Sequence, residues 1–265
     1  MWVAPALTSG LGNRLFQLFA AAGAAESWGY ELVISLAACK ESPHGPLASI
    51  FRMFPSVRVI EDKDNSIECY EAPRGFYVYT PIWPPPGKNC IISGFRQSPK
   101  YFPLHLAPNW DSALGGPLLR KKVESLAGLE SMEERQRTYA IHVRLGDYRL
   151  LPHHQVDLTK YYDAALKRVP AGARLHVFSD EPNACRSLFS GRNMTMAVTA
   201  SDAESLYEMS LCLGGTITAN STFSWWGAWF AHQAGAAWAT YPNSMGNGQP
   251  EPIDLVPSWG ITLPV

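Results

Sequence analysis

Apolar and polar positions along the second half of the chain follow two alternating patterns. Short apolar runs rich in strand-forming residues occur at 139–144, 174–179, 195–199, 216–219 and 236–241. Between them, apolar positions at helical spacing predict helices at 159–169, after Pro182, at 202–212 and at 222–233. Thr159 is the expected N-cap of the first of these, and Ser201 with Glu204 forms an expected capping box. Strands and helices alternating at this spacing predict right-handed crossovers and a parallel sheet.

The first half shows the same alternation less clearly. Strands are expected at 3–7, 32–35, 57–60 and 90–94, and an apolar helix at 15–28. The polar, partly helical stretch 108–137 is the expected passage from one sheet to another. The prediction is an α/β protein with two Rossmann-like parallel-sheet halves facing a cleft, an N-terminal domain at 1–135 and a C-terminal domain at 136–265.

Composition narrows the classes of function. The chain has 265 residues, 46% of them hydrophobic, and a net charge of -1 from 22 Lys+Arg and 23 Asp+Glu. The chain therefore has enough apolar residues for a hydrophobic core. Its charge balance provides no broad basic surface for nucleic-acid binding. The longest apolar runs, 16–25 and 223–231, are shorter than the ~20 residues of a membrane span. We expect a chain that is soluble as given, cytoplasmic by preference, or from the Golgi if an anchor has been removed.

The first candidate for chemistry is the glycine turn between the first expected strand and helix. Gly10 and Gly12 would let the backbone approach a ligand closely, and the helix start offers free N–H groups. The turn is not the dinucleotide fingerprint, because Leu15 stands where the third glycine would fall. A tight packing turn explains the two glycines equally well.

The second candidate is the segment 141–148, at the end of an expected strand. Side chains alternate along a strand, so His142 and Arg144 should share one face. A buried arginine needs a partner, and its planar fork suits a phosphate. Asp147 would orient Arg144 or reach into the cleft. The alternative is an internal Arg144–Asp147 ion pair without a ligand.

Two further segments place polar residues at strand ends. Asn220 ends a strand and Ser221 or Thr222 caps the next helix, whose unpaired N–H groups and neighbouring hydroxyls could hold a diphosphate. The aromatic residues that follow at helical spacing are expected in the core. Asp180 could bind the ribose hydroxyls or the amine edge of a guanine, or it could cap the helix at Pro182.

Metal and thiol sites have weak signals. Asp62 and Asp64 form a DxD pattern that can hold a divalent cation on a nucleotide diphosphate. They lie in a charged run typical of a solvated turn, so we expect no metal there. The five cysteines are far apart and form no CxxC pair, so neither a zinc site nor a redox dithiol is encoded locally.

Five blocks together resemble glycosyltransferase family 11, the α-1,2-fucosyltransferases. The GGLGNQxFQ signature of that family is similar to residues 10–17, and its HVRRGDY block to residues 141–148. Further similar blocks lie at 93–102, 177–180 and 220–226, in the same order. Two departures are Leu145, where the family usually has a second Arg, and Arg14, where it usually has Gln.

The resemblance implies a GT-B-like fold, with residues 1–135 as the acceptor-side domain and 136–265 as the GDP-sugar-binding domain. The implied donor is GDP-fucose, and the implied acceptor is a glycan with a terminal galactose, whose recognition is expected in loops such as 70–88 and 150–158. The resemblance also implies inversion at the fucose anomeric carbon, with no cofactor and no required metal. The catalytic residues it implies are Arg144 on the β-phosphate, Asp147 as a candidate base and Asn13 near the departing phosphate. The residues expected around the donor nucleotide are Gly10, Gly12, His142, Asp180, Asn220, Ser221, Thr222 and Phe223.

Three alternatives stay open at this point. The chain could use another nucleotide sugar on the same scaffold, or it could be a metal-dependent transferase that uses Asp62 and Asp64. It could also be a glycan-binding module that has lost catalysis. The last class would have no need of Arg144 together with hydroxyls at a helix start.

Overall fold

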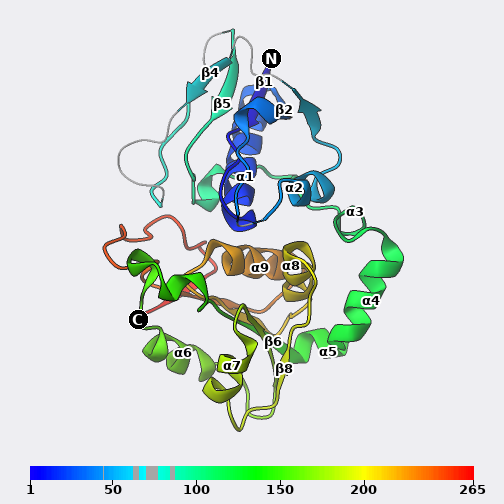
Figure 1. Cartoon of the computed structure of the whole chain (residues 1–265), viewed down its shortest axis with the longest axis vertical. Coiled ribbons are helices and arrows are strands. Elements are labelled where there is room, and N and C mark those ends of the chain that lie inside the picture. The colour runs from blue at the N-terminus through cyan, green and yellow to red at the C-terminus, as the bar shows by residue number, and fades with distance from the viewer. Residues whose placement is uncertain (44, 62–65, 70–76, 84–86) are drawn as a thin grey trace. The chain divides into compact units, whose positions relative to one another are not determined.

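The computed structural model describes residues 1–43, 45–61, 66–69, 77–83 and 87–265, so the predicted Asp62/Asp64 pair lies outside the described residues. The chain forms two compact units, one of residues 1–113 and 252–257 and one of 114–251 and 258–265 (Figure 1). Each unit has its own parallel sheet. The predicted fold class, α/β and GT-B-like with two Rossmann-like parallel-sheet halves, is confirmed. The units part at residues 113 and 114, whereas the sequence placed the domain boundary after residue 135.

The first unit is built on a five-stranded sheet in the order β3-β2-β1-β5-β4. Its strands are β1 (Trp2–Pro5), β2 (Glu31–Ser35), β3 (Arg58–Ile60), β4 (Ser66–Cys69) and β5 (Asn89–Ile92). Its helices are α1 (Leu11–Trp28) and α2 (Ala48–Met53), with short 3-10 turns η1 (Leu36–Ala38) and η2 (Pro99–Tyr101). Helix α3 (Trp110–Leu114) contains the boundary between the units at residues 113 and 114.

Helix α1 supplies much of the core of this unit. Ala21, Ala24 and Ala25 pack against Val3 of β1 and Cys90 of β5. The helix begins at Leu11 and not at the predicted Leu15, because Gly10 is its N-cap and residues 11–14 of the predicted glycine turn form its first turn. It ends where Gly29 adopts a left-handed conformation at φ 66°, which favours glycine.

The second unit is built on a six-stranded sheet. Its strands are β6 (Thr138–Val143), β7 (Arg174–Ser179), β8 (Met194–Met196), β9 (Gly215–Ile217), β10 (Ala239–Pro242) and β11 (Ile261–Leu263). Its helices are α4 (Pro117–Ala127), α5 (Met132–Arg137), α6 (Thr159–Leu166), α7 (Pro182–Leu188), α8 (Asp202–Ser210) and α9 (Thr222–Gln233). The turns η3 (Asp147–Arg149) and η4 (Pro152–His154) follow β6. The two helices α4 and α5 lie in the predicted connecting stretch.

The strand order β8-β7-β6-β9-β10-β11 is the 3-2-1-4-5-6 order of the doubly wound Rossmann fold. Helices α6 and α7 lie on one side of this sheet, and α8 and α9 lie on the other (Figure 1). The direction of strand order therefore reverses between β6 and β9. In such sheets, ligands bind outside the carboxyl ends of the strands at this reversal point.

The alternation predicted for β6 is confirmed at residues 141–143, but Arg144 lies beyond the end of the strand, so the face it was expected to share with His142 is not a face of β6. Ile141 and Val143 pack into an apolar cluster with Tyr161 and other residues of α6. The ring of His142 instead lies 5.7 Å from that of Phe223 in α9. His142 thus faces the α9 side of the sheet, as the period-2 pattern requires.

Two predicted helix caps were wrong in detail. Leu158, not Thr159, is the N-cap of α6, and the Asp157 carboxylate accepts the Thr159 N–H at 3.0 Å. Ser201 caps α8 by accepting the Glu204 N–H. The Glu204 carboxylate, however, accepts from the Ala200 N–H at 2.7 Å, one residue before the N-cap. Within the described parts of the chain, no helix combines the length and apolarity needed to cross a bilayer.

Candidate active site

Arg144 directly follows β6 at the point where the strand order reverses. Its Nε donates to Oδ1 of Asp147 at 3.0 Å, and its Nη2 lies 2.8 Å from the same oxygen. Its Nη1 lies 3.3 Å from Oδ2 of Asp180. The internal ion pair considered as the alternative is therefore present. The Arg144 side chain is nevertheless 31% exposed, and these contacts leave further N–H donors of the guanidinium for a ligand.

Asp180 is committed to this loop through both of its carboxylate oxygens. Oδ1 accepts the Leu145 N–H at 3.0 Å while Oδ2 faces Arg144. Gly146 lies so close that a Cβ built on it would be 2.5 Å from Oδ2 of Asp180. The alternative role of Asp180 as a helix cap was wrong, because Glu181 is the N-cap of α7 and Asp180 points to the Arg144 loop. The predicted nucleotide contact of Asp180 stays a prediction.

The start of α9 lies at the other side of the reversal point. Ser221 is its N-cap, with extended backbone and a side chain that accepts the Phe223 N–H at 3.3 Å. The Ser224 hydroxyl accepts the Ala219 N–H at 3.1 Å, which ties the strand end to the helix start. The first turn of α9 contains no acidic residue. This helix start can therefore present its positive end to an anion.

Asn220 holds two loops in place. Its Nδ2 donates to the backbone oxygen of His154 at 3.1 Å and to that of Met245 at 3.3 Å. The side chain is buried, so this amide contributes mainly to the position of the backbone. Its predicted contact with the nucleotide stays a prediction.

Tyr148 connects the Arg144 loop with the turn before α9, a role that sequence reasoning missed. Its hydroxyl donates to the Asn220 backbone oxygen at 3.3 Å. The centroid of its ring lies 5.6 Å from Cζ of Arg144. The ring also stacks on that of His154, with 4.3 Å between the two ring centroids. Burial raises the pKa of Tyr148, so the hydroxyl stays protonated and can donate. The available signal was an aromatic residue one helical turn after Arg144.

His142 is buried beneath this site. Burial, and after it the charge of Arg144, lower the pKa of His142 to about 3. The imidazole is therefore neutral at ordinary pH. Among the described residues, its Nδ1 has no hydrogen-bond partner, which is a costly state for a buried polar atom and is common at ligand sites.

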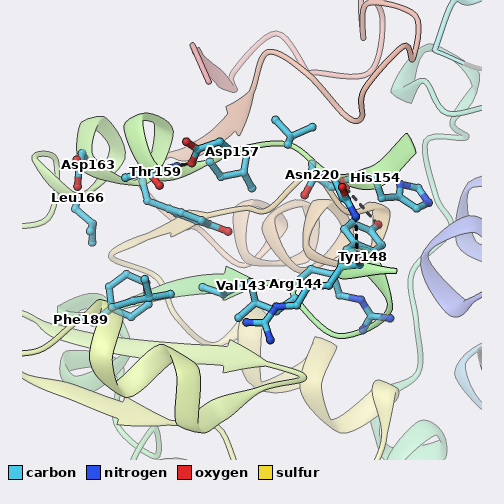
Figure 2. A pocket seen from close by; sticks show the side chains of 17 residues that line it. Val143, Arg144, Tyr148, His154, Asp157, Thr159, Asp163, Leu166, Phe189 and Asn220 are labelled. Atoms are coloured by element: carbon cyan, nitrogen blue, oxygen red, sulfur yellow. Dashed lines mark hydrogen bonds between the residues drawn. The ribbon is translucent and has the colours of Figure 1, made fainter. Parts of the chain in front are cut away.

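A cavity of about 520 Å³ opens beside Arg144 within the second unit (Figure 2). Its walls come from the end of β6, from η3 and η4, from α6 and α7, and from Asn220. The lining residues are Val143, Arg144, Leu145, Tyr148, Arg149, His154, Gln155, Val156, Asp157, Leu158, Thr159, Tyr162, Asp163, Leu166, Leu188, Phe189 and Asn220. This volume lies within the usual range for small-molecule sites.

The predicted Thr222 is the first residue of α9. The other predicted residues gather at the start of α1 in the first unit. Gly10 is the N-cap of α1 and Gly12 is buried in its first turn. Oδ1 of Asn13 accepts a hydrogen bond from Nε2 of Gln97 at 2.7 Å. Arg14 is fully buried and donates from Nη1 to the backbone oxygen of Gly45 at 2.7 Å. In the residues the structure describes, no group of three or more His, Cys, Asp or Glu is placed to hold a metal ion.

The fold and the cavity together define an α/β protein with a candidate ligand site at the reversal point of a Rossmann-like sheet. The model of glycosyl transferase family 11 matches residues 70–247, which is more than half of the chain. The chain therefore belongs to glycosyl transferase family 11.

Similarity to individual proteins covers less of the chain or is more distant. The chain is 35% identical to the O-antigen biosynthesis glycosyltransferase WbnK of Escherichia coli over 107 residues, 36% of this chain and 35% of that protein. The match thus spans about a third of that relative. A crystal structure of the NodZ α-1,6-fucosyltransferase co-crystallized with GDP shares 16% identity and a TM-score of 0.47, over 85% of this chain and 91% of that one. POFUT1 in complex with GDP shares 12% identity and a TM-score of 0.45, over 90% and 97%.

Proposed function

We propose that this transferase moves L-fucose from GDP-fucose to the 2-hydroxyl of a terminal galactose on a glycan, with inversion at the fucose anomeric carbon. Membership of glycosyl transferase family 11 supports the class of reaction. The observation that carries the proposal is Arg144, which stands at the reversal point next to the start of α9. A guanidinium and a helix start placed together suit a nucleotide diphosphate.

The reaction needs stabilisation of negative charge on the departing nucleotide. The galactose hydroxyl oxygen forms a bond to C1 of fucose, and the bond from C1 to the β-phosphate oxygen breaks. The electron pair of that bond stays on the phosphate oxygen, and GDP leaves. The hydroxyl proton passes to a carboxylate, for which Asp147 is the candidate. Preorganised donors aimed at the growing charge lower the barrier by about 3 kcal/mol each.

The ion pairs of Arg144 fit this role. Asp147 and Asp180 contact the guanidinium from two sides and fix its orientation before a donor arrives. A diphosphate would take the remaining donors and compete with Asp147 for the shared ones. Displacement of Asp147 by the phosphate would free its carboxylate to accept the proton of the acceptor.

The nucleotide preference tests the donor assignment. Isothermal titration should give the highest affinity for GDP, with UDP and dTDP at least about tenfold weaker, one factor of ten being about 1.4 kcal/mol. The reaction of GDP-fucose with lactose, a saccharide with a terminal galactose, should then give a product whose linkage NMR assigns to the 2-hydroxyl. Preferred binding of UDP or dTDP would favour another nucleotide sugar. Lactose binding without GDP release would favour a glycan-binding module.

Removal of divalent metal tests the remaining alternative. We propose that neither a cofactor nor a metal is required, because Arg144 and the α9 start already supply positive charge to the diphosphate. Turnover in excess EDTA should therefore equal turnover in its absence. A loss of turnover in EDTA that added Mg²⁺ or Mn²⁺ restores would support a metal-dependent transferase. If Asp62 and Asp64 hold that metal, added Mg²⁺ or Mn²⁺ should not restore turnover in an Asp62→Asn/Asp64→Asn variant.

A further inference from the structure

We propose that the cavity beside Arg144 is the subsite for the acceptor saccharide. This inference rests on the proposed function, because it takes Arg144 as the ligand of the β-phosphate. It goes further in placing part of the acceptor in a defined cavity of the second unit, on the α6–α7 side of the sheet. From the sequence, acceptor specificity was expected in loops such as 70–88 and 150–158, and the second of these loops lines the cavity.

The order of groups in the donor gives the first argument. Along GDP-fucose, the nucleoside, α-phosphate, β-phosphate and fucose follow one another, and the acceptor approaches the fucose end. Arg144 and Asn220 line the cavity, whereas Ser221, Thr222 and Phe223 at the start of α9, all described residues, do not. If the α9 start holds the α-phosphate and Arg144 the β-phosphate, the cavity adjoins the end of the donor where fucose meets its acceptor.

The chemistry of the walls gives the second argument. Asp157, just before α6, lies along one wall with Thr159 and Asp163 of α6, and Val143 and Phe189 lie along the opposite wall (Figure 2). Carboxylates and a hydroxyl match the hydroxyl groups of a neutral saccharide, and apolar side chains match its C–H faces.

The rigidity of the walls gives the third argument. The Tyr162 hydroxyl donates to the His142 backbone oxygen at 2.8 Å, which fixes this ring in the wall. At the end near Arg144, Tyr148 and His154 are stacked and Asn220 Nδ2 bonds the His154 backbone oxygen. A preformed site of this kind binds with little loss of conformational freedom. The acceptor hydroxyl would meet fucose C1 at this end of the cavity. There its oxygen would form the bond to C1 while the bond from C1 to the β-phosphate oxygen breaks.

Leu188→Trp tests the subsite by filling part of the cavity. Leu188 lines the cavity but is 60% exposed, so a larger side chain can be accommodated without breaking the core. We expect the KM for lactose to rise about tenfold or more, as for other changes of pocket size. The KM for GDP-fucose and the Kd of GDP should stay within about twofold of the wild-type values, because the proposed donor site lies outside the cavity. Leu118→Trp is the matched control, because Leu118 is 82% exposed on α4 and does not line the cavity.

Asp163→Asn is a second variant that changes the wall without changing its shape. It should raise the KM for lactose several-fold and leave the Kd of GDP unchanged. A weaker Kd of GDP in Leu188→Trp, with an unchanged KM for lactose, would overturn the proposal and assign the cavity to the nucleoside. Unchanged constants in both variants would overturn it as well. A wild-type chain that binds no GDP would overturn the proposed function and the subsite with it.

Discussion

At the scale of single residues, the orientation of Arg144 depends on close packing around the loop that follows β6. Asp147 and Asp180 contact its guanidinium, and Gly146 leaves space for the Asp180 carboxylate. Each of these residues acts through the position of Arg144. Small changes of shape in this loop should therefore affect donor binding more than stability.

Gly146→Ala tests this dependence. The new Cβ would lie 2.5 Å from Oδ2 of Asp180, so the carboxylate must move away from Arg144 and from the Leu145 N–H. We expect the affinity for GDP in isothermal titration to fall about tenfold or more, the equivalent of one lost charged hydrogen bond.

Gly235→Ala is the control for that variant. Gly235 has φ +101° and no atom within 4 Å of a built Cβ, so alanine there meets backbone strain but no neighbour. Stability should fall by about 1–2 kcal/mol while the affinity for GDP stays unchanged. If Gly146→Ala likewise lowers stability but leaves the affinity for GDP unchanged, the packing of Gly146 against Asp180 does not contribute to donor binding.

The buried His142 predicts a dependence of stability on pH. Its folded pKa of about 3 lies below the unfolded value of about 6.5, so between these values the unfolded chain binds a proton that the folded chain does not. The free energy of unfolding should therefore fall as the pH falls from about 6.5 toward 3, by up to about 1.4 kcal/mol per pH unit. Denaturant unfolding at several pH values measures this slope.

His142→Gln should reduce the slope in that pH window, because glutamine does not titrate. His105→Gln, at an exposed position in the first unit, is the matched control and should retain the wild-type slope. Equal slopes for wild type and His142→Gln would show that His142 is protonated in the folded chain or does not contribute.

At the scale of elements, the site depends on how two turns are joined. The loop after β6 carries Arg144 and the turn after β9 begins α9, and the Tyr148 hydroxyl bonds across them. Asn220 then bonds η4 and the segment around Met245 to the same turn. These hydrogen bonds fix the distance between the guanidinium and the helix start.

Tyr148→Phe and Tyr148→Leu separate the hydroxyl from the ring. Phenylalanine loses the hydrogen bond to Asn220 but keeps the ring beside Arg144 and His154, so the affinity for GDP should fall only a few-fold. Leucine also loses the stack and the contact with the guanidinium, and we expect a further loss of about fivefold. Isothermal titration of GDP into both variants measures the two steps. Equal affinities for GDP in Tyr148→Phe, Tyr148→Leu and the wild type would show that Tyr148 does not contribute to donor binding.

Much of the element pattern of the second unit could be predicted from sequence. Strand β7 and helix α9 have the predicted bounds, because strong apolar runs and a clear N-cap define them. Strand β11 was not predicted, since its three residues are stabilised by pairing with β10 far along the chain and not by local preference. The caps at Thr159 and Glu204 differ because the Asp157 carboxylate binds the Thr159 N–H, and because the Glu204 carboxylate accepts from the Ala200 backbone N–H in place of that of Ser201.

The site could be predicted only in part for a similar reason. His142 follows from the strand period, Arg144 from the chemistry of a guanidinium, and Ser221 from the rules of helix capping. The stack of Tyr148 on His154, the closeness of Gly146 to Asp180 and the cavity depend on packing between segments. Such contacts leave no signal in the spacing of one sequence.

At the scale of the whole molecule, the chain consists of two compact units that share one polypeptide in an interleaved order. Residues 252–257 belong to the first unit although they come after most of the second. Within the first unit, Asp254 accepts the Tyr79 N–H at 2.7 Å and pairs with Lys100 at 2.5 Å. Leu255 is 1% exposed. The late segment is therefore part of the core of the first unit.

Leu255→Ala should destabilise the first unit selectively. Loss of this buried side chain costs about 2–4 kcal/mol by the usual cost of a core cavity. Hydrogen exchange should then speed up in β1 and β5 and stay unchanged in β6 and β9. Equal acceleration in both sheets would show that the two units unfold as one.

The rate of fucose transfer by Arg144→Ala tests the central claim, that a guanidinium and the α9 start hold the departing diphosphate. Arg144 is partly exposed and its partners can be solvated, so the variant should fold with wild-type circular dichroism. Transfer from GDP-fucose to lactose should fall at least about 100-fold, the equivalent of about 3 kcal/mol of lost charge stabilisation. Arg144→Lys should recover only a fraction, since an ammonium lacks the planar fork. A folded Arg144→Ala variant that transfers fucose at the wild-type rate would contradict the account.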